Sequence, residues 1–291
     1  MRIVLKLNYL LFIFFISCWG DEPLASSQSQ TFKVKELKVV TYNLHYFDRG
    51  FQPILRTIKE LNADVIALQE VLVHNGVDYS KLIARKLKYY HLSSSPYVSY
   101  RNGKYKWVLS FLSKYPMKKV SEKWLQNYRL AFKVRVSVDG QGISFINTHL
   151  SPFTWPKKGV LKANIRRSER RQKEVNDLIQ WAGKPLNPSV LLGDFNCLPM
   201  MKELKLIKNI GYRDVYGELN ESHKETYQID NKELSKRLKR YLPLFSLAGE
   251  ITLDYIFIGG MIKTLSVNVI HSDASDHYPV KAKIIIPIKK R

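Results

Sequence analysis

Apolar runs that end abruptly in polar residues recur along this chain, and they indicate buried strands that carry side chains to one edge of a sheet. The clearest run, residues 189–192, leads directly into Gly193-Asp194-Phe195-Asn196. Asp194 and Asn196 stand two residues apart, so on extended backbone their side chains point to the same side. Gly193 lets the backbone approach a ligand closely. The alternative interpretation is a simple strand-to-turn transition, because Asp and Asn are common in turns.

The same pattern occurs at other strand candidates, which end in a carboxylate, an amide or an imidazole. These ends are Asn43, Glu70, His149, Asp254 and the adjacent pair Asp276 and His277, in or beside apolar runs at 37–44, 64–70, 143–150, 251–258 and 278–286. Apolar residues at helical spacing predict amphipathic helices at 52–61 and 78–87. Further strands are expected at 106–112 and 129–138. Strands interspersed with helices predict an α/β fold whose strand ends line a ligand site.

These side chains offer hard oxygen ligands with few imidazoles and no cluster of thiolates, a set that favours Mg²⁺ or Mn²⁺ over zinc. Asp276 and His277 are adjacent, so on extended backbone they face opposite ways, and one could serve a metal while the other serves a substrate. The sequence has no glycine-rich nucleotide loop and no Gly-x-Ser-x-Gly elbow, which argues against kinases and serine hydrolases. The set therefore points to chemistry on a phosphoryl group near a metal.

Short motifs surround the candidate residues and follow one another in a fixed order. They are Thr41-Tyr42-Asn43, Leu68-Gln69-Glu70, Phe111-Leu112-Ser113-Lys114-Tyr115-Pro116-Met117, Asn147-Thr148-His149-Leu150, Gly193-Asp194-Phe195-Asn196, Leu253-Asp254-Tyr255-Ile256-Phe257 and Ser275-Asp276-His277-Tyr278-Pro279. In this order they resemble the motifs of the endonuclease/exonuclease/phosphatase superfamily, the group of pancreatic deoxyribonuclease, abasic-site endonucleases and neutral sphingomyelinases. Any one motif is a weak signal, whereas the complete ordered set is specific.

The resemblance covers residues 37–286 and implies a deoxyribonuclease I-like fold, an α/β four-layer sandwich of two mixed β-sheets flanked by helices. It also implies that a phosphate ester is hydrolysed by in-line attack of an activated water with the help of Mg²⁺ or Mn²⁺. By the matching positions, Asn43, Glu70 and Asp276 would hold the metal. Some members carry a second acid where this chain has His45, so both one and two metals remain open.

The same resemblance implies roles for the remaining motif residues. His277 would be the general base for water, oriented by Asp254 as a carboxylate orients the imidazole of a triad. Asp194 and Asn196 would position the nucleophile and the phosphate. His149 would either donate a hydrogen bond to a phosphate oxygen or protonate the leaving group.

Charge and composition reduce the number of substrate classes to consider. Lysine and arginine total 47 against 25 acidic residues, so the formal charge is +22. This excess favours an anionic partner, and we expect nucleic acid rather than phospholipid, although a proteome-wide bias towards lysine would give the same balance. The basic run at 157–173 follows His149, and its Arg166, Arg167 and Arg170 are expected to contact phosphate unless the run is only a solvated face. A Trp-x-Asp-Arg motif is absent after Asn196, which argues against inositol-polyphosphate phosphatases.

The N-terminus has the features of a targeting segment. Arg2 and Lys6 precede a short apolar run at 9–16, and Cys18 follows in a sequence that resembles a bacterial lipobox. We therefore predict a signal peptide at 1–17, a flexible tether at 18–35 and one hydrolase domain at 36–288. The expected location is the cell envelope, with lipid on Cys18 bringing the enzyme to a membrane, or the exterior if the protein is simply secreted. Cys197 is expected to be a buried, unreactive thiol.

Three functions remain in view at this point. The first is a metal-dependent phosphodiesterase that acts as a nuclease, and the second is a sphingomyelinase-type phospholipase with the same chemistry. The third is a catalytically silent surface-binding protein that reuses the fold. A monomer is expected in each case.

Overall fold

The computed structural model describes residues 32–100, 103–152, 160–228 and 251–289. The predicted signal peptide, Cys18 and most of the tether lie outside these residues. So does a second basic cluster at 232–240, which its sequence indicates to be a surface insertion. The unit described below is residues 32–291.

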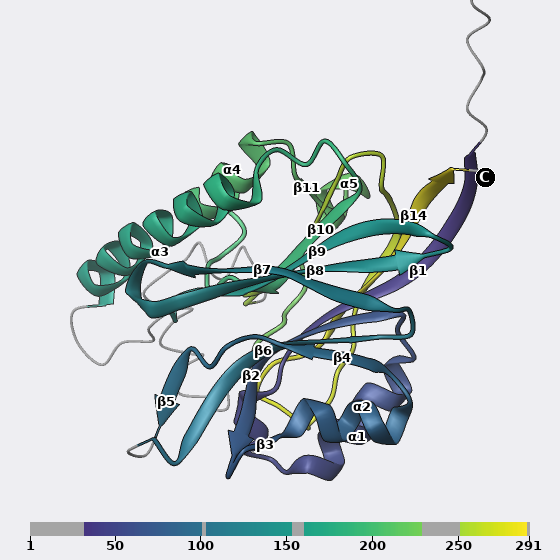
Figure 1. Ribbon diagram of the computed structural model, residues 1–291. Helices are drawn as coiled ribbons and strands as arrows, with labels where there is room; N and C mark the ends of the chain where they lie inside the picture. The colour runs from purple at the N-terminus through teal and green to yellow at the C-terminus, as the bar shows by residue number, and fades with distance from the viewer. Residues whose placement is uncertain (1–31, 101–102, 153–159, 229–250, 290–291) are drawn as a thin grey trace, which may run out of the picture. The chain divides into compact units, whose positions relative to one another are not determined.

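Two mixed β-sheets form the centre of this unit (Figure 1). The first, in spatial order, contains β13 (Lys263–Val269), β14 (Val280–Lys289), β1 (Phe32–Asn43), β2 (Val65–His74), β6 (Tyr105–Ser113) and β4 (Tyr90–Ser93), with β3 (Val77–Asp78) on β2 and β5 (Val98–Tyr100) on β6. The second contains β11 (Arg213–Asp214), β12 (Asp254–Gly259), β10 (Ser189–Asp194), β9 (Gln141–His149), β8 (Arg129–Val138) and β7 (Met117–Leu125). Each sheet has one parallel pair, β1 with β2 and β9 with β10, and the other pairs are antiparallel.

Helices cover the outer faces of both sheets. The helical elements are η1 (His45–Phe47), α1 (Phe51–Leu61) and α2 (Tyr79–Leu87) in the first half, and η2 (Gln126–Tyr128), α3 (Val160–Ala182), α4 (Lys202–Asn209) and α5 (Val215–Glu218) in the second. The short α5 differs from the covering helices, because its Val215 and Tyr216 belong to the core between the sheets. The apolar faces of α1 and α2 pack on the first sheet, and those of α3 and α4 pack on the second. Because the strands alternate between two buried faces, Val39 lies in the core between the sheets while Val40 packs against the α1 side. The four-layer α/β sandwich predicted from sequence is confirmed.

The predicted elements agree with the structure where apolar residues recur along the sequence with a clear helical or strand period. The strand at 129–138 has the predicted bounds, and α1 and α2 begin within one residue of the predicted helices. Several elements were not predicted, among them β7 and α4. β7 is an edge strand in which most positions are at least partly exposed, so its sequence lacks a continuous apolar run. Among the described residues, no helix is long and apolar enough to cross a membrane.

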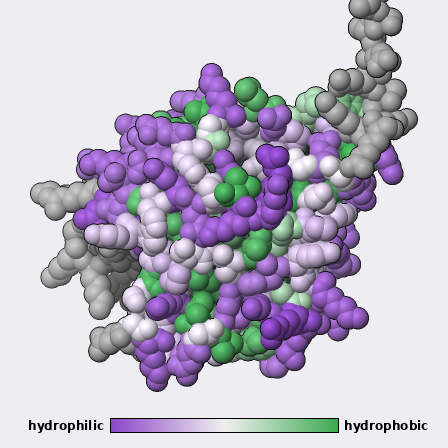
Figure 2. All heavy atoms as spheres, in the orientation of Figure 1, coloured by the Kyte–Doolittle hydropathy of each residue, from purple (hydrophilic) through white to green (hydrophobic). Residues whose placement is uncertain are grey.

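The view in Figure 2 shows a mostly hydrophilic face with apolar side chains scattered over it. Exposed apolar side chains of the described residues come from different elements, for example Val120 and Trp124 on β7 and Met261 after β12. On this face they do not merge into a continuous apolar patch of the kind that marks a binding surface.

Candidate active site

The site lies where the carboxyl ends of the parallel strands meet. Asn43 ends β1, His149 ends β9 and Asp194 ends β10, and all three side chains are buried. His149 and Asp194 are direct neighbours in the register of the second sheet. Since both sheets end their parallel strands here, residues far apart in the sequence are brought into one polar cluster.

Asp194 is the centre of this cluster. Its Oδ2 accepts a hydrogen bond from Nδ2 of Asn43 at 3.0 Å. The same oxygen lies 3.5 Å from Nε2 of His149 and 3.9 Å from Nε2 of His277. Its Oδ1 accepts the backbone N–H of Asn196 at 2.9 Å. Burial raises the pKa of this carboxyl to about 7, the charges of Asp254 and Glu70 add to the shift, and His277 and Asn43 oppose it.

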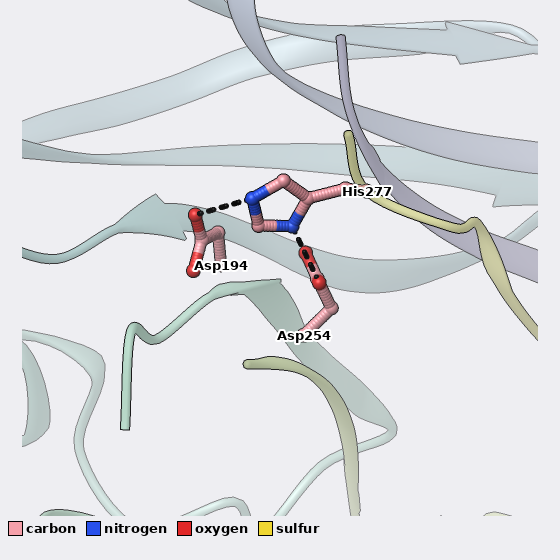
Figure 3. A group of neighbouring side chains, drawn as sticks. All are labelled: Asp194, Asp254 and His277. Atoms are coloured by element: carbon pink, nitrogen blue, oxygen red, sulfur yellow. Dashed lines mark hydrogen bonds and ion pairs between the residues drawn. The ribbon is translucent and has the colours of Figure 1, made fainter. Parts of the chain in front are cut away.

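Asp254 and His277 form a buried pair beside Asp194 (Figure 3). Nδ1 of His277 lies 2.8 Å from Oδ2 of Asp254, so the carboxylate fixes the ring and turns the opposite nitrogen, Nε2, towards Asp194. Burial alone would lower the pKa of His277. The charge and hydrogen bond of Asp254, together with the charges of Asp194 and Asp276, outweigh burial and raise this pKa to about 10.

The predicted metal ligands form the other side of the site. Nδ2 of Asn43 is 3.3 Å from Oε1 of Glu70, so the amide of Asn43 joins Glu70 to Asp194. Burial raises the pKa of Glu70, and Asp276 is close enough for its charge to add to that shift. Oδ1 of Asp276 lies 3.4 Å from Nδ1 of His45, the residue that stands where some superfamily members have a second acid.

Asn196 and Gly193 differ from their predicted geometry. Asn196 has a φ of 51°, so it follows the strand in a left-handed turn and not on extended backbone. Its Nδ2 donates to the carbonyl of Leu150 at 3.2 Å, which ties the ends of β9 and β10 together. Gly193 approaches a neighbouring strand and not a ligand, because an added Cβ would lie 2.0 Å from the carbonyl oxygen of Thr148.

The predicted phosphate-contacting arginines lie on α3. Arg170 is exposed, whereas the side chains of Arg166 and Arg167 lie outside the described residues. Arg171, which belongs to the same basic run, is fully buried and pairs with Glu203 at 3.1 Å. Arg171 is therefore turned away from the solvated side of the run, and its ion pair anchors α3 to α4.

Two residues near the site were not singled out from the sequence. The hydroxyl of Tyr97 is 2.8 Å from Nδ1 of His149, and Tyr97 is almost fully buried. The second is Arg129. Burial lowers the pKa of His149 well below its usual value, and the charge of the nearby Arg129 adds to this effect. Tyr97 follows Ser-Ser-Pro in a loop and belongs to no motif, so the sequence offers no local signal for it.

The chemistry of the donor set fits a divalent cation. Carboxylates and an amide oxygen are hard ligands, and they come from Asn43 at the end of β1, Glu70 at an irregular point inside β2, and Asp276 in a loop. The prediction that Glu70 ends its strand is therefore wrong, because β2 continues to His74. Burial is the largest cause of the raised pKa values of Glu70 and Asp194, nearby carboxylates add to it, and Oδ1 of Asp254 is buried without a hydrogen-bond partner among the described residues. Asp194, Asp254 and His277 also group closely enough to hold an ion. Because Nδ1 of His277 is already engaged by Asp254, this trio is better suited to proton transfer.

Comparison with known proteins agrees with the fold and the motif order. The family model described as the Endonuclease/Exonuclease/phosphatase family matches residues 40–277. A search of curated protein sequences found no match. Similar solved structures include an endonuclease/exonuclease/phosphatase from Beutenbergia cavernae DSM 12333, which is 18% identical with a TM-score of 0.63 over 86% of this chain and 71% of that chain.

Two further similar structures carry more specific titles. The human Nocturnin catalytic domain with bound sulfate is 17% identical, with a TM-score of 0.62 over 88% of this chain and 97% of that chain. ANGEL2, a 2′,3′-cyclic phosphatase in complex with adenosine-2′,3′-vanadate, is 15% identical, with a TM-score of 0.60 over 88% of this chain and 99% of that chain. These identities establish similarity of fold alone. On the family match over residues 40–277, the chain belongs to the endonuclease/exonuclease/phosphatase family, whose members are phosphoric ester hydrolases and are generally dependent on divalent metals.

Proposed function

We propose that this protein is a divalent-metal-dependent phosphodiesterase that cleaves nucleic acid. The observation that carries the proposal is the buried Asp254–His277 pair, whose free ring nitrogen faces Asp194. A carboxylate–imidazole pair aimed at a second carboxylate is suited to taking a proton from a water molecule. A silent binding protein would have no need to bury three such groups together.

His277 acts as the general base in this mechanism. Asp254 accepts the Nδ1–H of the ring, so that Nε2 is directed into the site and receives the proton of the attacking water. Asp194 lies within 3.9 Å of the same nitrogen and orients the water. Asn43 and His149 present N–H groups to Asp194, and these donors are placed to turn to the phosphoryl oxygens of a substrate.

Asn43, Glu70 and Asp276 would hold the metal, which we propose to be Mg²⁺ or Mn²⁺. When bound, this ion supplies the positive charge that neutralises the phosphoryl oxygens and the leaving oxygen. A general base must be neutral before it can accept a proton. The pKa of about 10 that the surrounding carboxylates give His277 must therefore fall once positive charge enters the site.

Nucleic acid is the proposed substrate because of the charge of the chain. Loss of the predicted signal peptide, which carries Arg2 and Lys6 and no acid, lowers the formal charge of +22 by two to +20. A surface of this charge binds polyanions without sequence preference, with an affinity that falls steeply as salt rises. Arg170 is exposed on α3 and contributes to that surface.

One side-by-side assay tests the chemistry and the substrate together. Purified protein is incubated with plasmid DNA, with RNA and with sphingomyelin liposomes, each with Mg²⁺, with Mn²⁺ and with EDTA, and a His277→Ala protein is run as control. We expect metal-dependent cleavage of nucleic acid. Cleavage of sphingomyelin alone would replace the substrate and keep the mechanism. No turnover of any phosphate ester, with ligand binding unchanged in the His277→Ala protein, would support the silent binding protein.

We further propose that the protein is exported as a monomer and is attached to the cell envelope by lipid on Cys18. The support comes from the sequence at 1–18 alone, and the part of the predicted tether that precedes β1, residues 18–31, would leave the enzyme domain free to reach its substrate. A Cys18→Ala change should move the protein from the detergent phase to the aqueous phase in Triton X-114 partitioning, with activity unchanged. If the parent protein is itself aqueous, simple secretion replaces the lipoprotein.

A further inference from the structure

Tyr97 is a buried side chain that touches the site without belonging to any of its motifs. It lies between β4 and β5 with 5% of its surface exposed, and it packs in the core between the two sheets. Its backbone N–H donates to the carbonyl of Trp107 at 3.0 Å, which fixes the loop on β6. A tyrosine held in this way has a hydroxyl group with little freedom to move.

The phenol oxygen of Tyr97 connects two site residues from different sheets. It lies 2.8 Å from Nδ1 of His149, and the two rings are nearly perpendicular, at 84°, with centroids 5.8 Å apart. Glu70 is near enough to the same oxygen for its charge to help burial raise the pKa of Tyr97. Tyr97 therefore contacts His149 of the second sheet and lies close to Glu70 of the first.

Glu70 turns towards this part of the site because β2 is irregular at that point. The register of β2 against β6 shifts between Leu68 and Val71, and Glu70 has a φ of 50°. A left-handed, non-glycine residue in a bulge is a strained conformation that persists only when its surroundings hold it. This bulge brings Oε1 of Glu70 within 3.6 Å of Nε2 of His149.

These contacts fix the direction of the hydrogen bond to His149. Among the described residues, Nδ1 of His149 is the one hydrogen-bond partner of the Tyr97 hydroxyl. A buried hydroxyl hydrogen without an acceptor is costly, so Tyr97 donates to Nδ1. The single proton of the His149 ring is then on Nε2, which faces Oε1 of Glu70 and Oδ2 of Asp194 at 3.6 and 3.5 Å.

We infer that Tyr97 is a positioning residue that holds His149 as the Nε2–H tautomer. In this form His149 serves as a hydrogen-bond donor to a phosphoryl oxygen and not as the acid that protonates the leaving group. The tautomer follows from the contacts of Tyr97, whereas the role towards phosphate rests on the proposed function. Of the two roles that the sequence leaves open for His149, donor to phosphate and acid for the leaving group, this tautomer fits the first. The contact of Tyr97 with His149 also makes the loop at 94–97 part of the catalytic apparatus.

The tautomer is tested directly by NMR, without turnover. Long-range ¹H–¹⁵N correlation spectra of the histidine rings are recorded for the wild type, for Tyr97→Phe and for Tyr212→Phe. Tyr212 is a matched control, because its buried hydroxyl also bonds a side chain, Ser189, at the opposite end of β10 from Asp194. We expect the Nε2–H form of His149 in the wild type and in Tyr212→Phe, and a populated Nδ1–H form in Tyr97→Phe. The Nδ1–H form in the wild type, or an unchanged His149 in Tyr97→Phe, would overturn the inference.

The role towards phosphate is tested by changing the leaving group. Bis(p-nitrophenyl) phosphate releases an anion that needs no proton, whereas a dinucleotide releases an alkoxide that does. If His149 is a donor to phosphate, His149→Ala should lower kcat by a similar factor on both substrates, on the order of 10²–10³. Tyr97→Phe should lower kcat about 10-fold on both with little change in KM, and Tyr212→Phe should match the wild type.

A large loss on the dinucleotide with no loss on the p-nitrophenyl ester would show that His149 is the acid, and would contradict the inference. If the wild type cleaves neither substrate, the proposed function fails, while the NMR spectra still decide the tautomer. Thermal unfolding of all variants separates these effects from loss of fold.

Discussion

Asp78, which is half-buried, and Asp194, which is buried, both lie beside histidines, yet their surroundings shift the pKa values of their carboxyl groups in opposite directions. Asp78 belongs to what we call the α2 network, which comprises Asp78, Ser80, His91, Ser93 and Ser110. Its oxygens accept from the backbone N–H and hydroxyl of Ser80 at 2.8 and 2.6 Å and from the hydroxyl of Ser93 at 2.5 Å. Burial alone would raise the pKa of Asp78, but hydrogen bonds from His91, Ser80 and Ser93 outweigh it and lower the pKa to about 2.

The catalytic cluster, which comprises Asp194, Asp254 and His277, shows the reverse. Burial and neighbouring carboxylates raise the pKa of Asp194 to about 7, and Oδ1 of Asp254 has no hydrogen-bond partner. The α2 network satisfies its carboxylate with donors and caps the first turn of a helix, so it stabilises the fold. In this cluster, which we propose to be catalytic, the charges of Asp254 and Glu70 oppose the ionisation of Asp194, an arrangement that stability alone would not select and that is common at functional sites.

The largest expected effect comes from replacing Asp194 by Asn. Activity should fall by about 10³–10⁵-fold, on the scale seen when a member of a catalytic unit is lost. The free energy of unfolding at pH 8 should not fall. An acid whose pKa is higher in the folded than in the unfolded state costs stability once the pH exceeds the unfolded value, and the full cost applies above pH 7. Urea unfolding at pH 8 checks this, and a loss of several kcal/mol there would contradict the comparison.

Metal binding should stabilise the protein through the site and not through the α2 network. With free Mg²⁺ or Mn²⁺ at 100 times its Kd, the expected stabilisation is about 2.7 kcal/mol, seen as a rise in Tm. Glu70→Gln should abolish the rise, because it removes a charged ligand, whereas Asp78→Asn should retain it. A rise in Tm that survives Glu70→Gln would place the metal elsewhere.

Asp78→Asn should show the opposite pattern to Asp194→Asn. The free energy of unfolding at pH 7 should fall by about 2 kcal/mol, because a carboxylate with a pKa lowered to about 2 loses its favourable interactions. The kcat of the folded enzyme should remain unchanged. Urea titrations and steady-state kinetics at 25 °C measure both quantities, and a parallel fall in kcat would show that the α2 network also serves the site.

The pH dependence of the Asp78 effect is the smallest and most specific prediction. A lowered pKa means that the stabilisation is fully present above the unfolded value of 3.8 and is lost as the pH falls through about 2. The difference in unfolding free energy between the wild type and Asp78→Asn should therefore be constant from pH 7 to 5 and should shrink towards pH 2. A difference that stays constant down to pH 2 would mean that the variant acts through packing.

Much of the fold and site could be predicted from sequence because strand burial and strand ends leave clear local patterns. The motif residues from Asn43 to His277 meet at one site, since each lies in or beside a strand that is largely buried. Features with no such pattern were missed, above all Tyr97, which reaches His149 from a loop by tertiary packing. The buried pairing of Arg171 was also missed, because a basic run does not show which of its members turns inward.

The central claim is that His277, supported by Asp254, activates water in a metal-dependent hydrolysis. The most direct measurement is the rate of bis(p-nitrophenyl) phosphate hydrolysis by the wild type and by His277→Ala, after removal of metal with EDTA and again after saturation with Mn²⁺ or Mg²⁺. The account predicts no activity in EDTA, full recovery of the wild type on adding metal, and recovery lower by about 10³-fold or more in His277→Ala. Activity that persists in EDTA, or a His277→Ala protein as active as the wild type, would contradict it.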